Sequence, residues 1–398
     1  MLALESDRTR VAAIEAQILI HERSISELRA TKELVQSRID SFKYPVLTLP
    51  NEIISEIFVH FLPTYPLRPP LVGVGSPTVL THICHSWRAI ALGTPVLWRA
   101  IDLSHSYMPA GVQIDVGNLW LSRSRCCPLS LKIGTEDFEM HISPYIDLIV
   151  PHRARWEHLE INLELSDLPP LTASMPLLRS LFITLGDVHF TSPTVAILEA
   201  PLLRSVRLDD VTAEAIILPW SQLTSLTLNR VYPRECVRLL QQTPDLVYCE
   251  LFLFYEHYPA VPEVLPRLSL PRLETLIMLE GQETSPVTEY LRTFAVPALS
   301  LLQVPEPFLG PDPIEYLKSF ISDAGCNLRT VVVTGQEIAF KNSYRSAFPA
   351  IPEFNFRRYH DYDDYSDVED DADPNARSVM PFPLNFRSLI LFLNASGG

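Results

Sequence analysis

Three stretches of the chain, 178–183 (LRSLFI), 203–208 (LRSVRL) and 223–228 (LTSLTL), share one pattern. Each stretch carries apolar residues at its first, fourth and sixth positions. The second half of the pattern alternates as a strand with one buried face does. The pattern therefore predicts a series of short strands whose apolar side chains meet in one common core.

The same unit recurs along most of the chain. It is found at Trp98/Ile101/Leu103, Trp156/Leu159/Ile161, Leu178/Leu181/Ile183, Leu203/Val206/Leu208, Leu223/Leu226/Leu228, Leu246/Cys249/Leu251, Leu273/Leu276/Met278, Leu299/Leu302/Val304, Leu328/Val331/Val333 and Phe386/Leu389/Leu391. A further strand is expected in the segment that ends at Ile133. From Trp156 to Leu328 successive units lie 20 to 29 residues apart. This spacing resembles that of leucine-rich repeats, whose core forms only by stacking.

The resemblance implies an α+β or α/β solenoid in which parallel strands form a horseshoe. The varying interval predicts that its curvature is irregular. The alternative is a different β-rich or mixed fold built from alternating strands.

In such a horseshoe, the residues between the buried positions line the inner face. They are His158, Glu160, Asn162, Ser180, Phe182, Thr184, Ser205, Arg207, Asp209, Ser225, Thr227, Asn229, Tyr248, Glu250, Phe252, Thr275 and Ile277. This mixture of polar and aromatic groups suits a protein or peptide partner. We expect Arg207, Tyr248, Glu250 and Phe252 to contact a protein substrate, and the alternative is that they are ordinary surface residues.

Residues 1–43 contain no Pro or Gly and predict one long helix. Two series of positions at seven-residue intervals run along it: Leu4, Val11, Ile18, Ile25, Lys32 and Ile39, and Asp7, Ile14, His21, Leu28, Val35 and Phe42. Nine of these twelve residues are apolar, which is typical of a coiled coil and is compatible with self-association. The alternative is an amphipathic helix packed against the C-terminal part of its own chain.

Residues 44–100 predict a compact helical block. The sequence Leu49-Pro50-Asn51-Glu52-Ile53 opens a helix that Pro63 ends. A Pro-rich loop follows, and a second helix is expected from Thr78 to Leu92. Pro95-Val96-Leu97-Trp98 then closes the block.

Taken together, these motifs resemble an F-box, and most closely the F-box proteins of mushroom-forming fungi. The resemblance implies that the block docks the Skp-type adaptor of a cullin ubiquitin ligase and has no catalytic chemistry of its own. It also implies that the adaptor is contacted or framed by Leu49, Pro50, Ile53, Ile57, Cys84 and Trp87. The alternative is that such residues form only the core of a helical hairpin, and we expect this role for Ile54, Phe58 and Ile90.

The remaining residues, 101–398, are assigned to the repeat domain, with an acidic disordered insertion at 357–378. Eight acidic residues and no Lys or Arg occur between His360 and Asp373. The net charge of the 398-residue chain is −15, which argues against nucleic acid and anionic membranes as partners. No apolar run is long enough to span a membrane.

No catalytic motif, phosphate-binding loop or zinc-ligand spacing occurs in the sequence. The six cysteines are interpreted as reduced thiols of an intracellular protein, which is expected in the cytoplasm, the nucleus or both. We therefore expect a non-enzymatic substrate-recognition subunit of a ubiquitin ligase without metal or cofactor. The alternative is a non-degradative protein-interaction scaffold.

Overall fold

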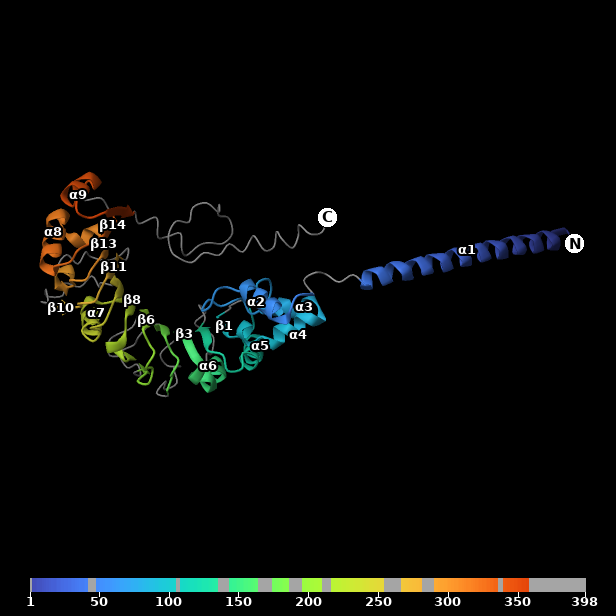
Figure 1. Ribbon diagram of the computed structural model, residues 1–398, viewed down its shortest axis with the longest axis horizontal. Helices are drawn as coiled ribbons and strands as arrows, with labels where there is room; N and C mark the ends of the chain where they lie inside the picture. The colour runs from blue at the N-terminus through green and yellow to red at the C-terminus, as the bar shows by residue number, and fades with distance from the viewer. Residues whose placement is uncertain are drawn as a thin grey trace.

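The structure is a computed structural model, and it describes residues 2–41, 48–104, 108–134, 143–163, 174–185, 195–209, 216–253, 266–280, 290–335 and 339–357. These residues form an α+β structure dominated by one long parallel sheet. The sheet lines the concave side of an arc, and α6, α7 and α8 lie on its convex side (Figure 1).

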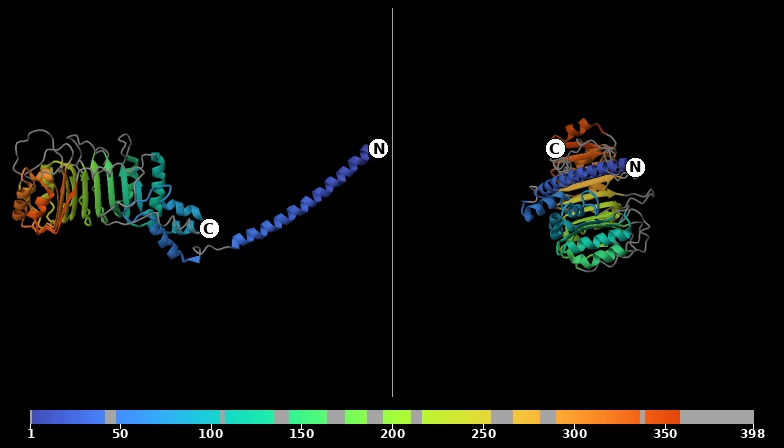
Figure 2. Two further views of the ribbon diagram at one scale, coloured as in Figure 1. Left: turned by 90° about the horizontal axis from the view of Figure 1, so that it is seen from above. Right: turned by 90° about the vertical axis from the view of Figure 1, so that its right-hand side faces the viewer.

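Within the described residues the main sheet has eleven strands, and each strand is parallel to its neighbours. They are β1 (Ala100–Leu103), β2 (Leu129–Gly134), β3 (Trp156–Leu163), β4 (Ser180–Leu185), β6 (Ser205–Asp209), β8 (Ser225–Val231), β9 (Tyr248–Leu253), β11 (Thr275–Glu280), β13 (Leu301–Pro305), β14 (Thr330–Thr334) and β15 (Glu353–Arg357). Their order in space follows their order in the chain, so the chain advances in one direction as in a solenoid (Figure 2).

Two short parallel pairs and the helices complete the described elements. The pairs are β5 (Val195–Ala196) with β7 (Ile216–Ile217), and β10 (Leu268–Ser269) with β12 (Phe294–Ala295). The α-helices are α1 (Leu2–Ser41), α2 (Asn51–Phe61), α3 (Pro77–Ile83), α4 (His85–Gly93), α5 (Ala110–Arg123), α6 (Ser143–Ile149), α7 (Pro233–Leu240), α8 (Pro313–Ala324) and α9 (Lys341–Ala347). Short 3-10 turns connect several of them, including η2 (Pro95–Trp98) and η7 (Glu306–Leu309).

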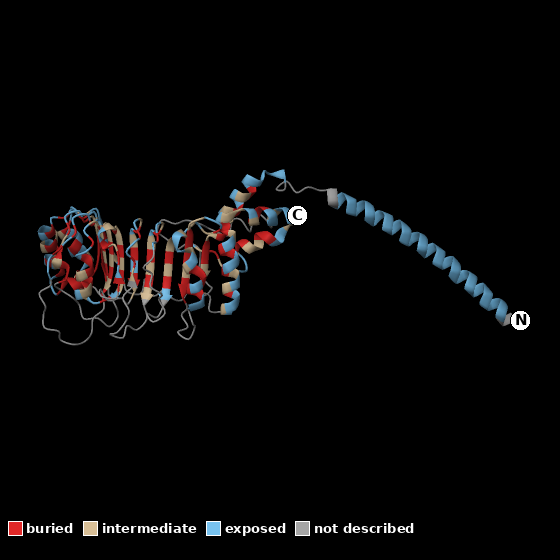
Figure 3. Cartoon of the chain, turned by 90° about the horizontal axis from the view of Figure 1, so that it is seen from below, coloured by how far each residue is buried: buried red, intermediate tan, exposed pale blue. Residues whose placement is uncertain are grey.

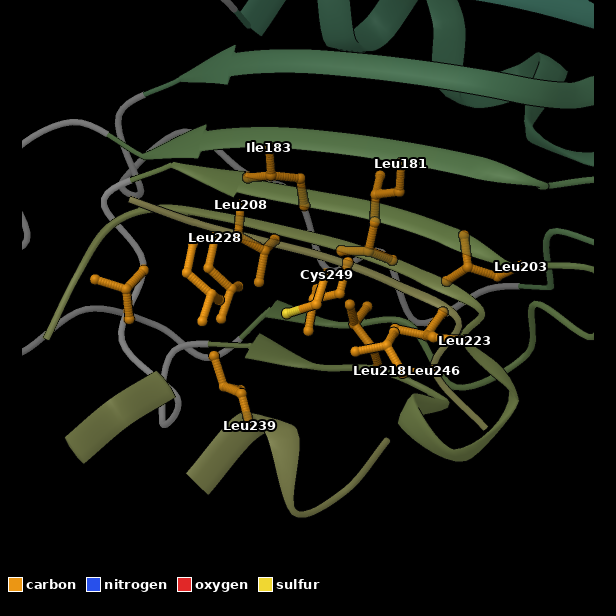
Figure 4. Packing of buried hydrophobic residues seen from close by; sticks show 14 of the residues in the cluster. Leu181, Ile183, Leu203, Leu208, Leu218, Leu223, Leu228, Leu239, Leu246 and Cys249 are labelled. Carbon is orange, nitrogen blue, oxygen red and sulfur yellow. The ribbon is translucent and has the colours of Figure 1, made fainter. Parts of the chain in front are cut away.

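The repeating apolar positions stack in register across the strands. Leu181, Val206, Leu226, Cys249 and Leu276 form one such column, and all five side chains are buried. Figure 4 shows side chains of the sheet pointing toward α7, from which Leu239 points back. Because no single turn covers its own apolar face, stacking is what removes these residues from water.

The strands predicted from the repeating unit are confirmed from Trp98 to Val333, and the strand expected at Ile133 is β2. The predicted strand at Phe386 and the predicted insertion lie outside the described residues, except that Arg357 belongs to β15. Strand β15 was missed, although Ile351, Phe354 and Phe356 match the repeating unit.

The prediction of one helix from Thr78 to Leu92 is wrong. Two helices, α3 and α4, meet at Cys84, whose backbone is extended (φ −156°, ψ 169°). The Cys84 thiol accepts a hydrogen bond from the Trp87 N–H at 3.4 Å and so caps the start of α4. A local capping interaction therefore overrides the continuous apolar pattern.

The predicted N-terminal helix is confirmed as α1, and its described side chains from Leu4 to Ile39 are all exposed (Figure 3). This exposure disagrees with the alternative in which the helix packs on its own chain. Among the described residues, no helix has the length and hydropathy needed to cross a membrane.

Candidate functional site

Helix α2 begins and ends where its prolines predict. Pro50 is the N-cap residue, and its carbonyl accepts hydrogen bonds from the N–H groups of Ile53 and Ile54 at 3.1 and 3.2 Å. Glu52 lies in the first turn, where a carboxylate stabilises the positive end of the helix dipole. Leu62 then adopts an extended conformation, as the residue before a proline commonly does.

The two long sides of α2 have opposite environments although both are apolar. Ile54 and Phe58 are 2% and 1% exposed, as the core interpretation of these residues predicted. On the other side, Ile53 and Ile57 are 49% and 40% exposed, and Leu49, which lies just before the helix, is 38% exposed. We call these three residues the α2 strip. Pro50, also exposed, lies between the first two.

Trp87 connects α4 to the buried side of α2. Its ring meets the Phe58 ring edge-on, with 4.9 Å between the centroids. The Trp87 side chain is partly buried, as is that of Cys84. Ile90, predicted as core, is buried. The six residues predicted to contact the adaptor are therefore divided: four are exposed, whereas Cys84 and Trp87 mainly support the helices.

The Pro-rich loop between α2 and α3 lies against the sheet. The Tyr65 hydroxyl donates a hydrogen bond to the Glu157 carboxylate at 2.8 Å, and the Arg68 guanidinium pairs with Glu160 at 2.7 Å. The Ser130 hydroxyl donates to the carbonyl of Pro66 at 2.7 Å. These contacts tie the loop to β2 and β3, and we call them the loop anchor.

The loop anchor changes the electrostatics of the residues that it covers. Burial raises the pKa of Tyr65 above its usual range, and the hydrogen bond to Glu157 raises it further. Burial lowers the pKa of His158, whose ring lies 5.4 Å from that of Tyr65. His158 and Glu160 were predicted to line a substrate surface, but this chain's own loop contacts them instead. Sequence reasoning missed Tyr65 and Arg68, since nothing in a Pro-rich loop indicates where it docks.

A continuous hydrophobic core joins the helical block to the sheet. The cluster that contains Ile54 and Phe58 extends through Trp98 to the strands. Trp98 is fully buried, donates from its indole N–H to the Ala91 carbonyl at 3.0 Å, and packs edge-on against Trp120. The α2 strip is therefore held in a fixed orientation relative to the sheet.

The four predicted substrate contacts lie close together on the concave surface. Arg207 on β6 and Glu250 on β9 occupy one row, with Thr227 of β8 between them. The Arg207 guanidinium lies 4.7 Å from the centre of the Phe182 ring and 3.4 Å from Asp209. Its side chain remains half exposed.

Tyr248 and Phe252 flank Glu250 on the same strand and are partly buried. The Tyr248 hydroxyl donates to Glu250 at 2.6 Å, and burial together with this bond raises the pKa of Tyr248. An aromatic pair beside one cation and one carboxylate is able to contact a peptide through both apolar and charged groups. Within the described part of the chain, no group of three His, Cys, Asp or Glu side chains is placed to hold a metal.

Comparison with known proteins adds little to this geometry. No protein-family model matches the chain, and no curated protein matches it. A solved structure from Bacteroides fragilis, a structural genomics target, is similar over 65% of this chain and 73% of its own, with 14% identity and a TM-score of 0.38. A likeness this weak decides neither fold nor function, so the functional argument rests on the side chains themselves.

Proposed function

We propose that this chain is the substrate-recognition subunit of a Skp–cullin–F-box ubiquitin ligase. In this proposal α2, α3 and α4 form an F-box that docks the Skp-type adaptor. The sheet is an irregular leucine-rich-repeat horseshoe that binds a protein substrate. Ubiquitin transfer is carried out by the other subunits.

The observation that carries the proposal is the α2 strip. Fully burying an Ile or Leu side chain contributes about 1.5–3 kcal/mol, so leaving three of them exposed within nine residues of the chain forgoes a substantial stabilisation. The same helix buries Ile54 and Phe58 completely, so its exposed side is not the result of poor packing. A contiguous exposed apolar surface on an anchored helix is typical of a protein-binding site.

The loop anchor supports a mechanism based on proximity. If the adaptor binds the α2 strip, the Trp98 core and the loop anchor fix its position relative to the concave surface. A stiff connection between two binding sites raises the effective concentration of a bound substrate near the catalytic subunits. Ubiquitin transfer needs such positioning and no further chemistry from this chain.

The first test is co-purification of the full chain with a Skp-type adaptor. Ile53→Asp places a carboxylate in the proposed interface and is expected to weaken adaptor binding by about 100-fold, because burying an unpaired charge is unfavourable. Val74→Asp is the matched control, since Val74 is an exposed apolar residue of the loop outside the α2 strip. Circular dichroism establishes that both variants are folded. Absence of adaptor binding by the intact wild-type chain would refute the proposal.

A second test separates the ligase from a non-degradative scaffold. The chain, adaptor and cullin are reconstituted, and ubiquitylation of co-purifying proteins is measured. Phe252→Ala and Arg207→Glu are expected to reduce substrate capture without changing adaptor affinity. Adaptor binding without cullin recruitment would support the scaffold instead.

A further inference from the structure

Helix α1 presents an apolar seam that no described part of the chain covers. Its first seven-residue series, position a, contains Leu4, Val11, Ile18, Ile25, Lys32 and Ile39, and its second, position d, contains Asp7, Ile14, His21, Leu28 and Val35. The apolar members of both series are 46% to 69% exposed. Leu19, Ile20 and Leu34 are also exposed but lie outside both series. The regular seven-residue spacing of the two series on a continuous helix fits the seam of a two-stranded coiled coil.

The polar residues of the seam decide the orientation of a second copy. In a parallel, in-register pair, each residue meets its own counterpart. Asp7 would then face the partner's Asp7, His21 the partner's His21, and Lys32 the partner's Lys32. Like charges placed together in a partly desolvated seam are unfavourable.

An antiparallel pair removes this conflict in one register, because position a then faces position d of the other helix. When Asp7 faces the partner's Lys32, the two opposite charges of the seam meet at both ends of the overlap. The remaining layers in this register are Leu4 with the partner's Val35, Val11 with the partner's Leu28, Ile14 with the partner's Ile25, and Ile18 with the partner's His21. The layer of Ile18 and the partner's His21 is the one that places a polar group opposite an apolar one.

The charged residues beside the seam are unfavourable in this register. Arg8 would lie near the partner's Arg29, and Glu15 near the partner's Glu22, so like charges approach beside the seam. These long side chains are exposed and screened by salt, so their repulsion is weaker than that of charges inside the seam. The seam therefore determines the orientation.

We propose that α1 forms an antiparallel coiled coil with α1 of a second copy, in the register that pairs Asp7 with the partner's Lys32. The overlap covers residues 4–35 of both helices. At 1.5 Å per residue a 40-residue helix is about 60 Å long, so the two helical blocks follow opposite ends of a rod of this length. One assembly then carries two concave surfaces, which raises the avidity for a substrate with two binding segments. This inference concerns α1 alone and does not depend on the ligase proposal.

Sedimentation equilibrium of the full chain tests the pairing. The wild type is expected to have twice the mass of the chain. Asp7→Lys leaves only lysines in the two layers that pair positions 7 and 32, and Lys32→Asp leaves only aspartates there. Each variant is expected to weaken dimerisation about tenfold or more, because like charges then meet. The double variant exchanges the charges and is expected to restore the wild-type affinity. Arg23→Glu, on the opposite side of α1, is the matched control for a change of charge.

Zero-length carbodiimide cross-linking tests the register directly. The reagent joins a carboxylate to an amine in contact, and Asp7 and Lys32 of one helix are about 37 Å apart along its axis. With an equal mixture of 15N-labelled and unlabelled chains, an Asp7–Lys32 link between labelled and unlabelled peptides is expected. A monomer at all concentrations, or a dimer without this link whose affinity is unchanged by Asp7→Lys, would overturn the proposal.

Discussion

Helix α2 and strand β8 differ in how they expose apolar side chains. The difference is clear from two adjacent residues in each element. In β8, Leu226 is buried and Thr227 points to the concave surface. In α2, Ile54 is buried, yet Ile53 beside it is 49% exposed. At this pair β8 thus matches side-chain polarity to environment, whereas α2 keeps an apolar group in water. Such a mismatch is typical of a binding surface and underlies the proposal for the α2 strip.

The largest effect is expected inside the sheet. Leu226→Asp buries an unpaired carboxylate in the stacked column and is expected to lower the free energy of unfolding by about 5 kcal/mol or more. Thr227→Ala, one position away on the other face, is expected to change it by less than about 0.5 kcal/mol. Denaturant unfolding followed by circular dichroism measures both. Similar values for the two variants would contradict the assigned faces of β8.

The next effect distinguishes the two sides of α2. Ile54→Ala removes buried methyl groups and is expected to cost about 2–5 kcal/mol of stability. Ile53→Ala removes the same atoms from an exposed position and is expected to cost less than about 1 kcal/mol. Urea unfolding of the two variants measures the difference. A cost at Ile53 equal to that at Ile54 would mean that the α2 strip is part of the core.

The sheet and helix α2 also differ in how far the sequence predicts which side chains are buried. An alternating strand pattern specifies which side chains are buried. In a sheet with one covered face, the apolar side chains of each strand all point to that face. The strands up to Val333 were therefore predictable. A helix with apolar residues on both sides does not say which side its own chain covers.

The loop anchor joins the two regions, and its removal is expected to have an intermediate effect. Arg68→Ala leaves Glu160 without this partner, and both side chains are largely buried, so a loss of about 1–3 kcal/mol is expected. Hydrogen exchange of residues 63–76 is expected to accelerate in the same variant. Lys318→Ala removes an exposed pair with Glu315 and is expected to cost at most about 0.5 kcal/mol. Unchanged exchange in Arg68→Ala would show that the loop is held by other contacts.

The smallest expected effect is a pH dependence caused by the covered histidine. Burial lowers the pKa of His158 below the value of 6.5 that it has when unfolded. The unfolded chain therefore binds more protons as the pH falls below that value, and the free energy of unfolding decreases until the pKa of the folded state is passed. His158→Gln is expected to flatten this decrease below about pH 6.5.

Unfolding at a series of pH values measures this slope, with His82→Gln at an exposed histidine as the matched control. Superimposable profiles for the wild type and His158→Gln would show that the loop does not bury this ring. Similar flattening in both variants would contradict the assignment to His158.

The sequence by itself determined the strand repeat, the long N-terminal helix and the ends of α2, because periodic apolar residues and prolines act locally. Only the tertiary structure decided that Tyr65 and Arg68 fasten a loop to β3, and that Glu306 is buried where it accepts hydrogen bonds from Tyr344 and the Ala339 N–H. The hydrogen bonds of the loop and of Glu306 join residues far apart in the chain. Such partners leave no periodic signal, since they come together only when stacking of the strands has placed them.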